Sequence, residues 1–542
     1  MSGMRLKESL AMVMIGLVIG SLLTLTVFNL QQTQETHETI EELSQGKNEV
    51  EEPIIIAEIG FVDIETRKIL TWKEVKEKLG TLKNMGVNTI FLWAPYDHPK
   101  KPINTIPCWT EVDGEVKKID LPIAKFNVVN LHAKDYLKPD LRRGSEEEFL
   151  EFIDEAHRLG FKVIGQFIAT CVSPESLFCR EHPEWLLKTE IEGEEYPAVS
   201  WPWRLRPWGY VVNKAHPGFI NYTCEVVIPY WIKEWGLDGI FLDSPAMPYC
   251  SERFKKLCGT FPSGFECLTP VKGNYTPDNL IKAMRRKIEE LERETGRDLI
   301  FAAEWIPTGR VEYWPDEAIK DFCEEWDLKT FWKYNRQYAG YELGSYFDFI
   351  WDYRFRGLLK QVKLLTSDRY VELLNRQMEK EAKVTRMARF VNMINGWKSF
   401  SNLLDPRWIG CYITLTVTAP GNIIWIGTVQ SNLPYAQEWY AKLIKIKKEY
   451  TALQSDNIED ALISTKIEGL IAYNRWDKDE SVTIIVNVND RPIDCVVKTR
   501  FKGDRVKVYD LISGEELEGN PESFSLTIPA YGSRILVLGE VD

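Results

Sequence analysis

The sequence lacks an excess of positive charge: its 542 residues carry 67 lysines and arginines against 80 aspartates and glutamates, a formal net charge of −13. Proteins that bind nucleic acids or anionic surfaces attract them through a surplus of basic residues. We therefore expect no nucleic-acid partner. The charge balance leaves uncharged substrates such as sugars open.

The sequence also lacks the cysteine spacing of a metal site, since none of its ten cysteines forms a C-x-x-C pair. We expect no metal and no cofactor. Cys171 and Cys179, like Cys250, Cys258 and Cys267, are spaced as cysteines that close loops, so disulfides and buried thiols both remain open. No repeat of solenoid period is present, which excludes a repeat architecture.

One long apolar run is present near the N-terminus. Residues 11–30 read AMVMIGLVIGSLLTLTVFNL and contain no charge, and about 20 such residues span a membrane as a helix. Arg5 and Lys7 precede the run and acidic residues follow it, so the positive-inside rule predicts a cytoplasmic segment 1–10 and a chain whose bulk lies outside the cytoplasm. Cleavage as a signal peptide, and hence secretion, is the alternative, but no small-x-small site follows the run.

The polar residues 31–52 after this run have little apolar surface to bury and predict a stalk. Gly16 and Gly20 form a G-x-x-x-G on the apolar run, a spacing found where membrane helices pack together. Another membrane protein or a second copy of the chain is therefore a candidate partner.

From Pro53 onward, apolar β-rich runs alternate with amphipathic helical stretches, the pattern of a parallel sheet with crossover helices. Eight such units predict an α/β fold of the (β/α)8 type over residues 53–455. The eight runs are Ile54–Phe61, Thr89–Ala94, Lys162–Ala169, Gly239–Ser244, Ile300–Ile306, Phe347–Arg354, Ala388–Asn395 and Ile423–Gly427.

Helices are predicted over Glu146–Gly160 with a Ser145 cap, over Pro217–Gly236 and over Thr276–Gly296. The third run is separated from its helix by a long interval, which predicts an inserted subdomain at about 171–215. This interval contains the segment WPWRLRPWGY. Its indole rings could stack on sugar rings, so three residues become candidate substrate-binding residues: Trp201, Trp203 and Trp208.

The sequence pattern changes after Gln454. Short alternating strands such as LIAYNRW, SVTIIVNV and RVKVYDL are separated by turn residues. This pattern predicts an antiparallel β-sandwich over residues 456–542.

Two carboxylates end neighbouring strand-like runs. Asp243 ends the fourth run, in GLDGIFLDSP, and Glu304 ends the fifth, in LIFAAEWIP. Barrel enzymes place their reactive groups at the C-terminal ends of the strands. Glycoside hydrolysis needs two carboxyl groups, one to attack or to activate water and one to protonate the leaving oxygen. We therefore take Asp243 and Glu304 as candidate catalytic residues, although a lone strand-end carboxylate more often caps a helix or pairs with a cation.

Three stretches carry a resemblance to a known family. VVNLHAKDYLKPDLRRGSEEEFLEFIDEAHRLGFKVIGQF is similar to the approach of the α-amylase family to its third strand. VVNKAHPGFINYTCEVVIPYWIKEWGLDGIFLD resembles the run into that family's nucleophile, and LTVTAPGNIIWIG its last helix and strand. The resemblance implies a glycoside hydrolase in which Asp243 is the nucleophile and Glu304 the general acid and base.

The chain departs from the family's pattern at several places. Where the family has an Asp, an Asn and a His after its third strand, this sequence offers Gln166, Thr170 and Cys171, which puts a calcium ligand in doubt. Phe241 stands two residues before Asp243, where the family has an Arg that helps to keep the nucleophile ionised. The loss of such groups predicts weaker stabilisation of the transition state.

Two further departures concern groups that hold the sugar. On ungapped matches, Leu131 and His132 replace a Tyr and an Asp before the second helix, and Ile394 and Asn395 replace a His-Asp pair at the seventh strand. An Asn can hydrogen-bond a hydroxyl but lacks the charge that strengthens such a bond. His132, Asn395 and Gln166 remain as candidate substrate-binding residues.

Two functions are therefore carried forward. The first is a retaining glycosidase or transglycosylase that acts on α-linked glucans or related sugars outside the cell. The second is a catalytically inactive ectodomain that binds carbohydrate or a membrane-protein partner. The paired carboxylates favour the enzyme, and the replaced neighbours favour the inactive scaffold.

Overall fold

The computed structural model describes residues 52–60, 68–99, 105–112, 115–122, 133–199, 209–243, 256–257, 271–272, 278–304, 314–325, 330, 334, 346–351, 354–384, 389–390, 392–393, 408–427 and 434–539. They belong to one compact unit, Glu52–Asp542. The predicted segments 1–10 and 11–30, and the predicted stalk apart from its last residue, lie outside the described residues. Within the described ranges, no helix is both long and apolar enough to cross a membrane.

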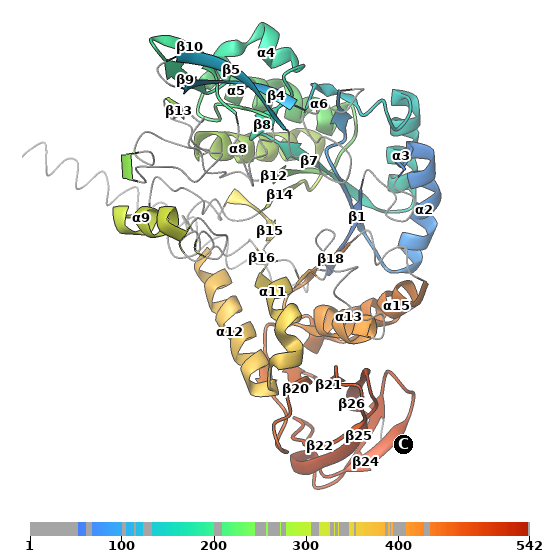
Figure 1. Ribbon diagram of the computed structural model, residues 1–542. Helices are drawn as coiled ribbons and strands as arrows, with labels where there is room; N and C mark the ends of the chain where they lie inside the picture. The colour runs from blue at the N-terminus through green and yellow to red at the C-terminus, as the bar shows by residue number, and fades with distance from the viewer. Residues whose placement is uncertain are drawn as a thin grey trace, which may run out of the picture. The chain divides into compact units, whose positions relative to one another are not determined.

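Parallel strands form the centre of this unit (Figure 1). Their order in the sheet is β16-β15-β14-β12-β7-β2-β1-β18-β17. The strands are β1 (Ile54–Ile59), β2 (Thr89–Leu92), β7 (Lys162–Ile168), β12 (Gly239–Asp243), β14 (Ile300–Glu304), β15 (Phe349–Trp351), β16 (Arg389–Phe390), β17 (Asn392–Met393) and β18 (Ile423–Ile426).

The two edges of this sheet are joined by the chain itself. β16 pairs with β15 at one edge, and β17 pairs with β18 at the other. Only Val391 separates β16 from β17 in the sequence. The sheet therefore curls round on itself, with β16 and β17 in the place of the seventh strand, which fits the predicted eight-stranded barrel.

Helices between the strands begin where the sequence supplies capping side chains. Thr71 and Ser145 form capping boxes at α2 (Trp72–Asn84) and α3 (Glu146–Arg158), as the Ser145 cap predicted. The helix predicted over Pro217–Gly236 forms α5 (Pro217–Tyr222), a π-helical segment (Thr223–Val227) and α6 (Ile228–Lys233). Pro229 has no N–H to donate to Glu225, which accounts for the break in the α-helical ladder. The helix predicted over Thr276–Gly296 is α8 (Asp278–Thr295).

Side chains that precede three strands tie those strands to their neighbours at the N-terminal end of the barrel. Asn88, Asp238 and Asp348 accept hydrogen bonds from the N–H groups of Ile55 (2.8 Å), Val163 (2.7 Å) and Phe301 (2.6 Å), respectively. Each acceptor satisfies the first backbone donors of the adjacent strand. The strand pairs β1–β2, β7–β12 and β14–β15 are therefore fixed at this end.

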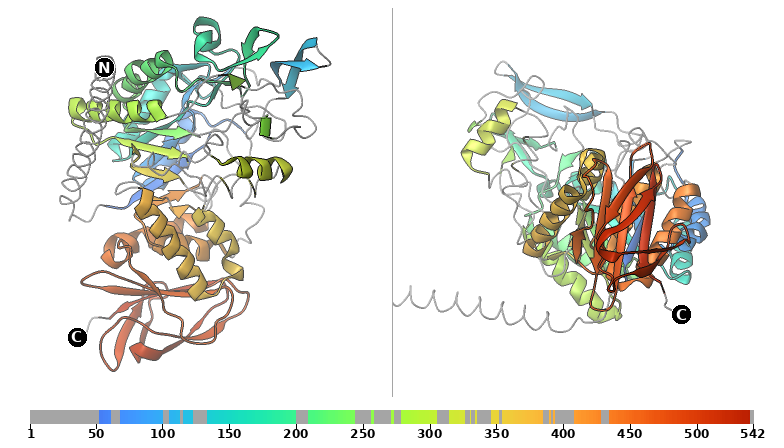
Figure 2. Two further views of the ribbon diagram at one scale, coloured as in Figure 1. Left: turned by 90° about the vertical axis from the view of Figure 1, so that its left-hand side faces the viewer. Right: turned by 90° about the horizontal axis from the view of Figure 1, so that it is seen from below.

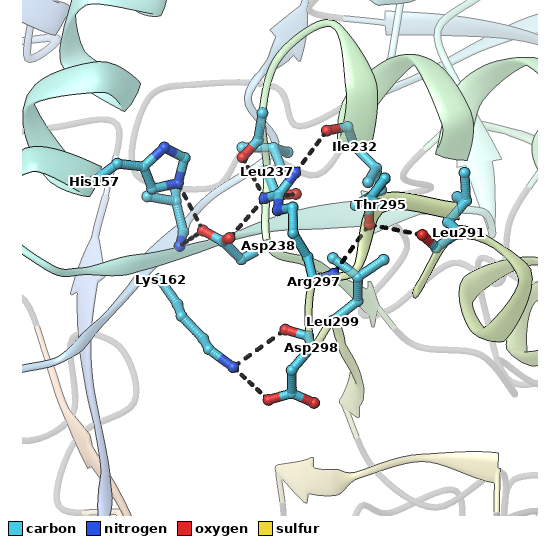
Figure 3. Close-up of polar contacts among 12 residues, drawn as sticks. His157, Lys162, Ile232, Leu237, Asp238, Leu291, Thr295, Arg297, Asp298 and Leu299 are labelled. Atoms are coloured by element: carbon cyan, nitrogen blue, oxygen red, sulfur yellow. Dashed lines mark hydrogen bonds and ion pairs between the residues drawn. The ribbon is translucent and has the colours of Figure 1, made fainter. Parts of the chain in front are cut away.

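The Asp238 carboxylate has three hydrogen-bonding partners, of which His157 and Arg297 are labelled in Figure 3. His157 of α3 lies 2.8 Å from its Oδ2, and Arg297 donates to its Oδ1 at 2.6 Å. Burial alone would raise the pKa of this carboxyl, but the hydrogen bonds from His157, Arg297 and the Val163 N–H outweigh burial and lower it. Arg297 also donates to the carbonyls of Ile232, Gly236 and Leu237.

The long connections after β2 and β7 carry further strands. After β2 come β3 (Tyr96–Asp97), a hairpin of β4 (Thr105–Val112) and β5 (Glu115–Pro122), and β6 (Asp135–Pro139). After β7 come β8 (Cys171–Val172), α4 (Leu177–Glu181), β9 (Lys188–Ile191), β10 (Glu194–Pro197) and β11 (Tyr210–Val211). β9 also pairs with β13 (Val271–Lys272). The predicted insertion thus contains secondary structure of its own, whereas the hairpin β4–β5 was not predicted.

The C-terminal part is antiparallel, as predicted. A sheet of order β19-β20-β21-β26-β23-β24 faces the pair β22-β25 across a shared apolar core. Figures 1 and 2 show these strands below the barrel. The strands are β19 (Ile458–Asp460), β20 (Leu470–Trp476), β21 (Ser481–Asn487), β22 (Ile493–Val497), β23 (Val506–Asp510), β24 (Glu516–Gly519), β25 (Phe524–Ile528) and β26 (Gly532–Leu538).

The two faces of the larger sheet bury different cores. On β20, Leu470 and Ala472 belong to the C-terminal core, while Ile471 and Tyr473 belong to the core shared with the barrel. This alternation follows the two-residue period of a strand. The contacts on the barrel side include α12 (Ser367–Val384) and α13 (Ile409–Thr418).

A buried arginine joins the C-terminal sheet to the barrel. Arg475 of β20 donates to the carbonyl of Thr418, the last residue of α13, and to the carbonyl of Asn457 at 2.8 Å. A cation suits the C-terminus of a helix, where carbonyl groups without helical partners gather. Lys447 of α15 (Pro434–Glu449) is also buried and donates to the Leu453 carbonyl at 2.8 Å.

Candidate active site

Asp243 and Glu304 lie at the C-terminal ends of neighbouring barrel strands. Asp243 is the last residue of β12 and Glu304 the last residue of β14. The register pairs Leu242 with Ala303, so the two carboxylates stand at the next positions on strands that are about 5 Å apart. Asp243 is half-buried and Glu304 is 8% exposed.

Aromatic rings fill the barrel below these carboxylates. Phe91 of β2 contacts Phe241 of β12 and Trp425 of β18, with ring centroids 4.9 and 4.7 Å apart. Neither strand is a neighbour of β2 in the sheet, so these rings meet inside the closed barrel. Phe241 is fully buried in this floor, two residues deeper than Asp243. It therefore lies below the level of the two carboxylates.

Gln166 of β7 points to the same interior as Asp243. Its Nε2 donates to Oδ2 of Asp243 at 2.5 Å, and its Oε1 accepts from the N–H of Ala94 at 3.1 Å. Only 1% of Gln166 is exposed. The sequence pattern indicated Gln166 as a candidate substrate-binding residue. In the structure it contacts Asp243, the candidate nucleophile.

Glu58 is a third carboxylate of this interior, which the sequence analysis missed. It lies on β1, is 8% exposed, and accepts a hydrogen bond from Nε1 of Trp425 at 3.2 Å. Its register partner is Phe91, so its side chain belongs to the inward face of the barrel. The available signal was a glutamate inside the apolar run IIIAEIG.

Two buried groups of the long connections interact with Asp243. Tyr96 of β3 and Cys171 of β8 both lie within electrostatic reach of the Asp243 carboxylate. Burial raises the pKa of Cys171 to about 12 and that of Tyr96 well above its ordinary value. Cys171 and Cys179 are both thiols rather than a disulfide.

The remaining candidate residues lie outside the described part of the chain. The structure therefore neither brings them to Asp243 nor separates them from it. They are His132, Asn395, Trp201, Trp203 and Trp208. Within the described ranges, no group of three or more His, Cys, Asp or Glu residues could hold a metal ion.

Comparisons with known proteins give structural matches alone. No family model matches the sequence, and no curated protein matches it. A maltogenic α-amylase from Thermotoga neapolitana superposes with a TM-score of 0.60 at 14% identity, covering 90% of this chain and 99% of its own. An α-amylase from Anoxybacillus gives 0.61 at 13% identity, covering 92% and 100%.

A debranching enzyme from Nostoc punctiforme gives a TM-score of 0.58 at 15% identity, covering 90% of this chain and 98% of its own. These matches extend over the barrel and the C-terminal sheet together. At such low identity they establish architecture rather than activity. The chain therefore has the fold of the α-amylases, with a carboxylate pair at the C-terminal end of its barrel.

Proposed function

We propose that this protein is a retaining α-glycosidase or transglycosylase that acts on α-linked glucans or related sugars. The observation that carries the proposal is the placement of Asp243 and Glu304 at matching positions of neighbouring strands. Retaining glycosidases hold their two carboxyl groups about 5–5.5 Å apart. The strand spacing allows this separation.

In the first step, a carboxylate oxygen of Asp243 attacks the anomeric carbon. A carbon–oxygen bond forms to the enzyme as the bond to the leaving sugar breaks, and Glu304 donates its proton to the leaving oxygen. In the second step, Glu304 takes a proton from water, or from a sugar hydroxyl in transglycosylation, and the new oxygen displaces Asp243.

The surroundings of the two groups support these roles. Glu304 is almost fully buried above an apolar floor, the kind of environment in which glycosidases keep their acid. Asp243 is more exposed and receives a hydrogen bond from Gln166. The aromatic floor closes the barrel from below, so the substrate would enter from the side of the long connections.

The proposal is tested with the purified protein, a panel of aryl α-glycosides and α-glucans, and two matched variants. Asp243→Asn should lose about 10⁴-fold or more in kcat, because an amide cannot form the covalent intermediate. Asp494→Asn, at an exposed position of β22 in the C-terminal part, should hydrolyse like the wild type. Equal rates in both variants would contradict the role of Asp243. An inactive wild type would contradict the enzyme and favour a scaffold that binds carbohydrate or a partner.

A further inference from the structure

The orientation of the Gln166 side chain is fixed by its two partners. Its Oε1 accepts from the backbone N–H of Ala94, and a backbone N–H can only donate. The Nε2 group must therefore face Asp243, and the contact of 2.5 Å is a donated hydrogen bond to the carboxylate. Gln166 holds one oxygen of the candidate nucleophile and in turn is held by the end of β2.

The end of β2 has an unusual backbone. Ala94 has a φ of 29°, which residues with a Cβ rarely adopt. Such a conformation persists only where the surroundings hold it in place. Here Gln166 contacts the Ala94 N–H, and Nε2 of His98 lies 3.0 Å from the Ala94 carbonyl. His98 is fully buried and packs against Tyr96, with ring centroids 5.0 Å apart.

We propose that Gln166 is a positioning residue for Asp243, and that the Ala94–His98 turn fixes Gln166 in place. This inference rests on the proposed function of Asp243. The amide of Gln166 supplies a neutral hydrogen-bond donor to the Asp243 carboxylate, beside the barrel floor that Phe241 occupies.

The physical effect of this contact is twofold. A hydrogen bond donated to the ionised form of a carboxyl favours that form. It also limits rotation of the carboxylate, so that the carboxylate keeps one orientation relative to the bound sugar. Neither effect requires contact between Gln166 and the substrate. The inference thereby differs from the expectation that Gln166 binds sugar.

The first test compares Gln166→Met and Gln166→Glu in the full-length protein, with an aryl α-glucoside across a range of pH. Gln166→Met keeps the size of the side chain but removes the donor. Its kcat should fall about 10²-fold, the usual loss for one preorganised donor, while KM changes less than about threefold. The acidic limb of the pH profile should move to higher pH, because the ionised form of Asp243 loses its donor.

Gln166→Glu should restore part of the activity at the acidic end of the range, where the new carboxyl is protonated and can donate. Tyr96 and Cys171 stay protonated because burial raises their pKa values. Glu304 and the buried Lys214 near Cys171 are the same in both variants, so a difference between the two profiles reports on residue 166. A rise in KM with unchanged kcat and an unmoved acidic limb would overturn the inference and make Gln166 a substrate-binding residue.

The second test concerns the turn. His98→Leu removes the group that contacts the Ala94 carbonyl, whereas His98→Gln keeps an N–H donor of similar reach. His98→Leu should lower kcat about tenfold in the same direction as Gln166→Met, a smaller loss than that of the direct donor, and His98→Gln should recover most of it. Thermal unfolding of both variants controls for misfolding. An unchanged kcat and acidic limb in a folded His98→Leu protein would remove the turn from the account.

A third measurement does not depend on activity. Carboxylate infrared absorption, assigned by difference from Asp243→Asn, gives the titration of Asp243 directly. The pKa of Asp243 should be higher in Gln166→Met than in the wild type. If the wild type hydrolyses no substrate, the proposed function fails while this titration still tests the contact. Identical titrations in the two proteins would contradict the positioning role.

Discussion

Two aspartates mark the two ends of strand β12. Asp238, just before the strand, is held by His157, by Arg297 and by a backbone N–H, and its pKa is lowered. Asp243, at the end of the strand, is half-buried and receives a hydrogen bond from the neutral amide of Gln166. They are five positions apart in the sequence.

Asp238 ties neighbouring elements of the fold together, whereas Asp243 is the proposed nucleophile. The hydrogen bonds from His157, Arg297 and the Val163 N–H favour the ionised form of Asp238 and fix its orientation. A nucleophile must keep one oxygen available to form a bond and then release it. The contrast follows the division of labour in barrels, with stability at the N-terminal end of the strands and chemistry at the C-terminal end.

The largest effect on activity that separates Asp238 from the proposed active site is expected at Glu304, the proposed general acid. Glu304→Gln should lower kcat/KM about 10³-fold on a maltooligosaccharide, because the leaving oxygen then departs without a proton. The loss should be far smaller on an aryl glycoside whose leaving group needs no proton. The kcat/KM of Asp238→Asn should stay within about threefold of the wild type on both substrates. Asp238 lies at the N-terminal end of the barrel, away from the reacting groups. Steady-state kinetics on the two substrates measure this, and equal losses on both would remove Glu304 as the acid.

The second effect concerns stability, which should depend more on Asp238 than on Asp243. Asp238→Asn should destabilise the protein by about 2–3 kcal/mol at neutral pH, since it removes the charge that His157 and Arg297 contact. The folded pKa of Asp238 is lowered, so this stabilisation is complete above the ordinary carboxyl pKa of about 4 and disappears as the pH falls through the lowered value.

Urea unfolding of the wild type and of Asp238→Asn at a series of pH values measures this difference. The gap between the two proteins should shrink below about pH 4. Asp243→Asn is the matched control from the other end of the strand. A gap that stays constant down to strongly acidic pH would show that the charge of Asp238 does not stabilise the fold.

A smaller effect is expected at Glu58. Glu58→Gln keeps an oxygen that can accept from Trp425 but removes a negative charge from the interior that Glu304 also faces. We expect kcat/KM to fall about tenfold and the basic limb to move to lower pH, because a nearby negative charge favours the protonated acid. An unchanged pH profile in the Glu58→Gln variant would show that Glu58 acts only in packing.

The smallest effect belongs to an exposed ion pair beside Asp238. Lys162 contacts Asp298 at 2.6 Å, but their side chains are 40% and 86% exposed (Figure 3). Lys162→Ala should change the free energy of unfolding by less than about 0.5 kcal/mol. A loss comparable to that of Asp238→Asn would show that exposure does not distinguish the two sites.

The sequence predicted the barrel strands because burial on both faces leaves a continuous apolar run. The hairpin β4–β5 escaped prediction for the opposite reason. Its second strand, EVKKIDLP, consists of exposed and half-buried residues and contains no apolar run. Period and hydrophobicity therefore identify strands of the core and miss those that extend from it.

The candidate site was predictable in part. Asp243 and Glu304 stood out as acids at the ends of apolar runs, and the same rule applied to IIIAEIG would have found Glu58. The contact of Gln166 with Asp243 was not predictable. It depends on the turn at Ala94, which lies 72 residues earlier in the chain, and no local pattern records a contact across strands.

The most direct measurement of the central claim is the configuration of the sugar when it is first released. Proton NMR of the reaction mixture, recorded before mutarotation, distinguishes the α-anomer from the β-anomer. Two displacements at one carbon, through Asp243 with Glu304 as acid and base, predict that the α-anomer appears first. Initial release of the β-anomer would contradict the covalent role of Asp243.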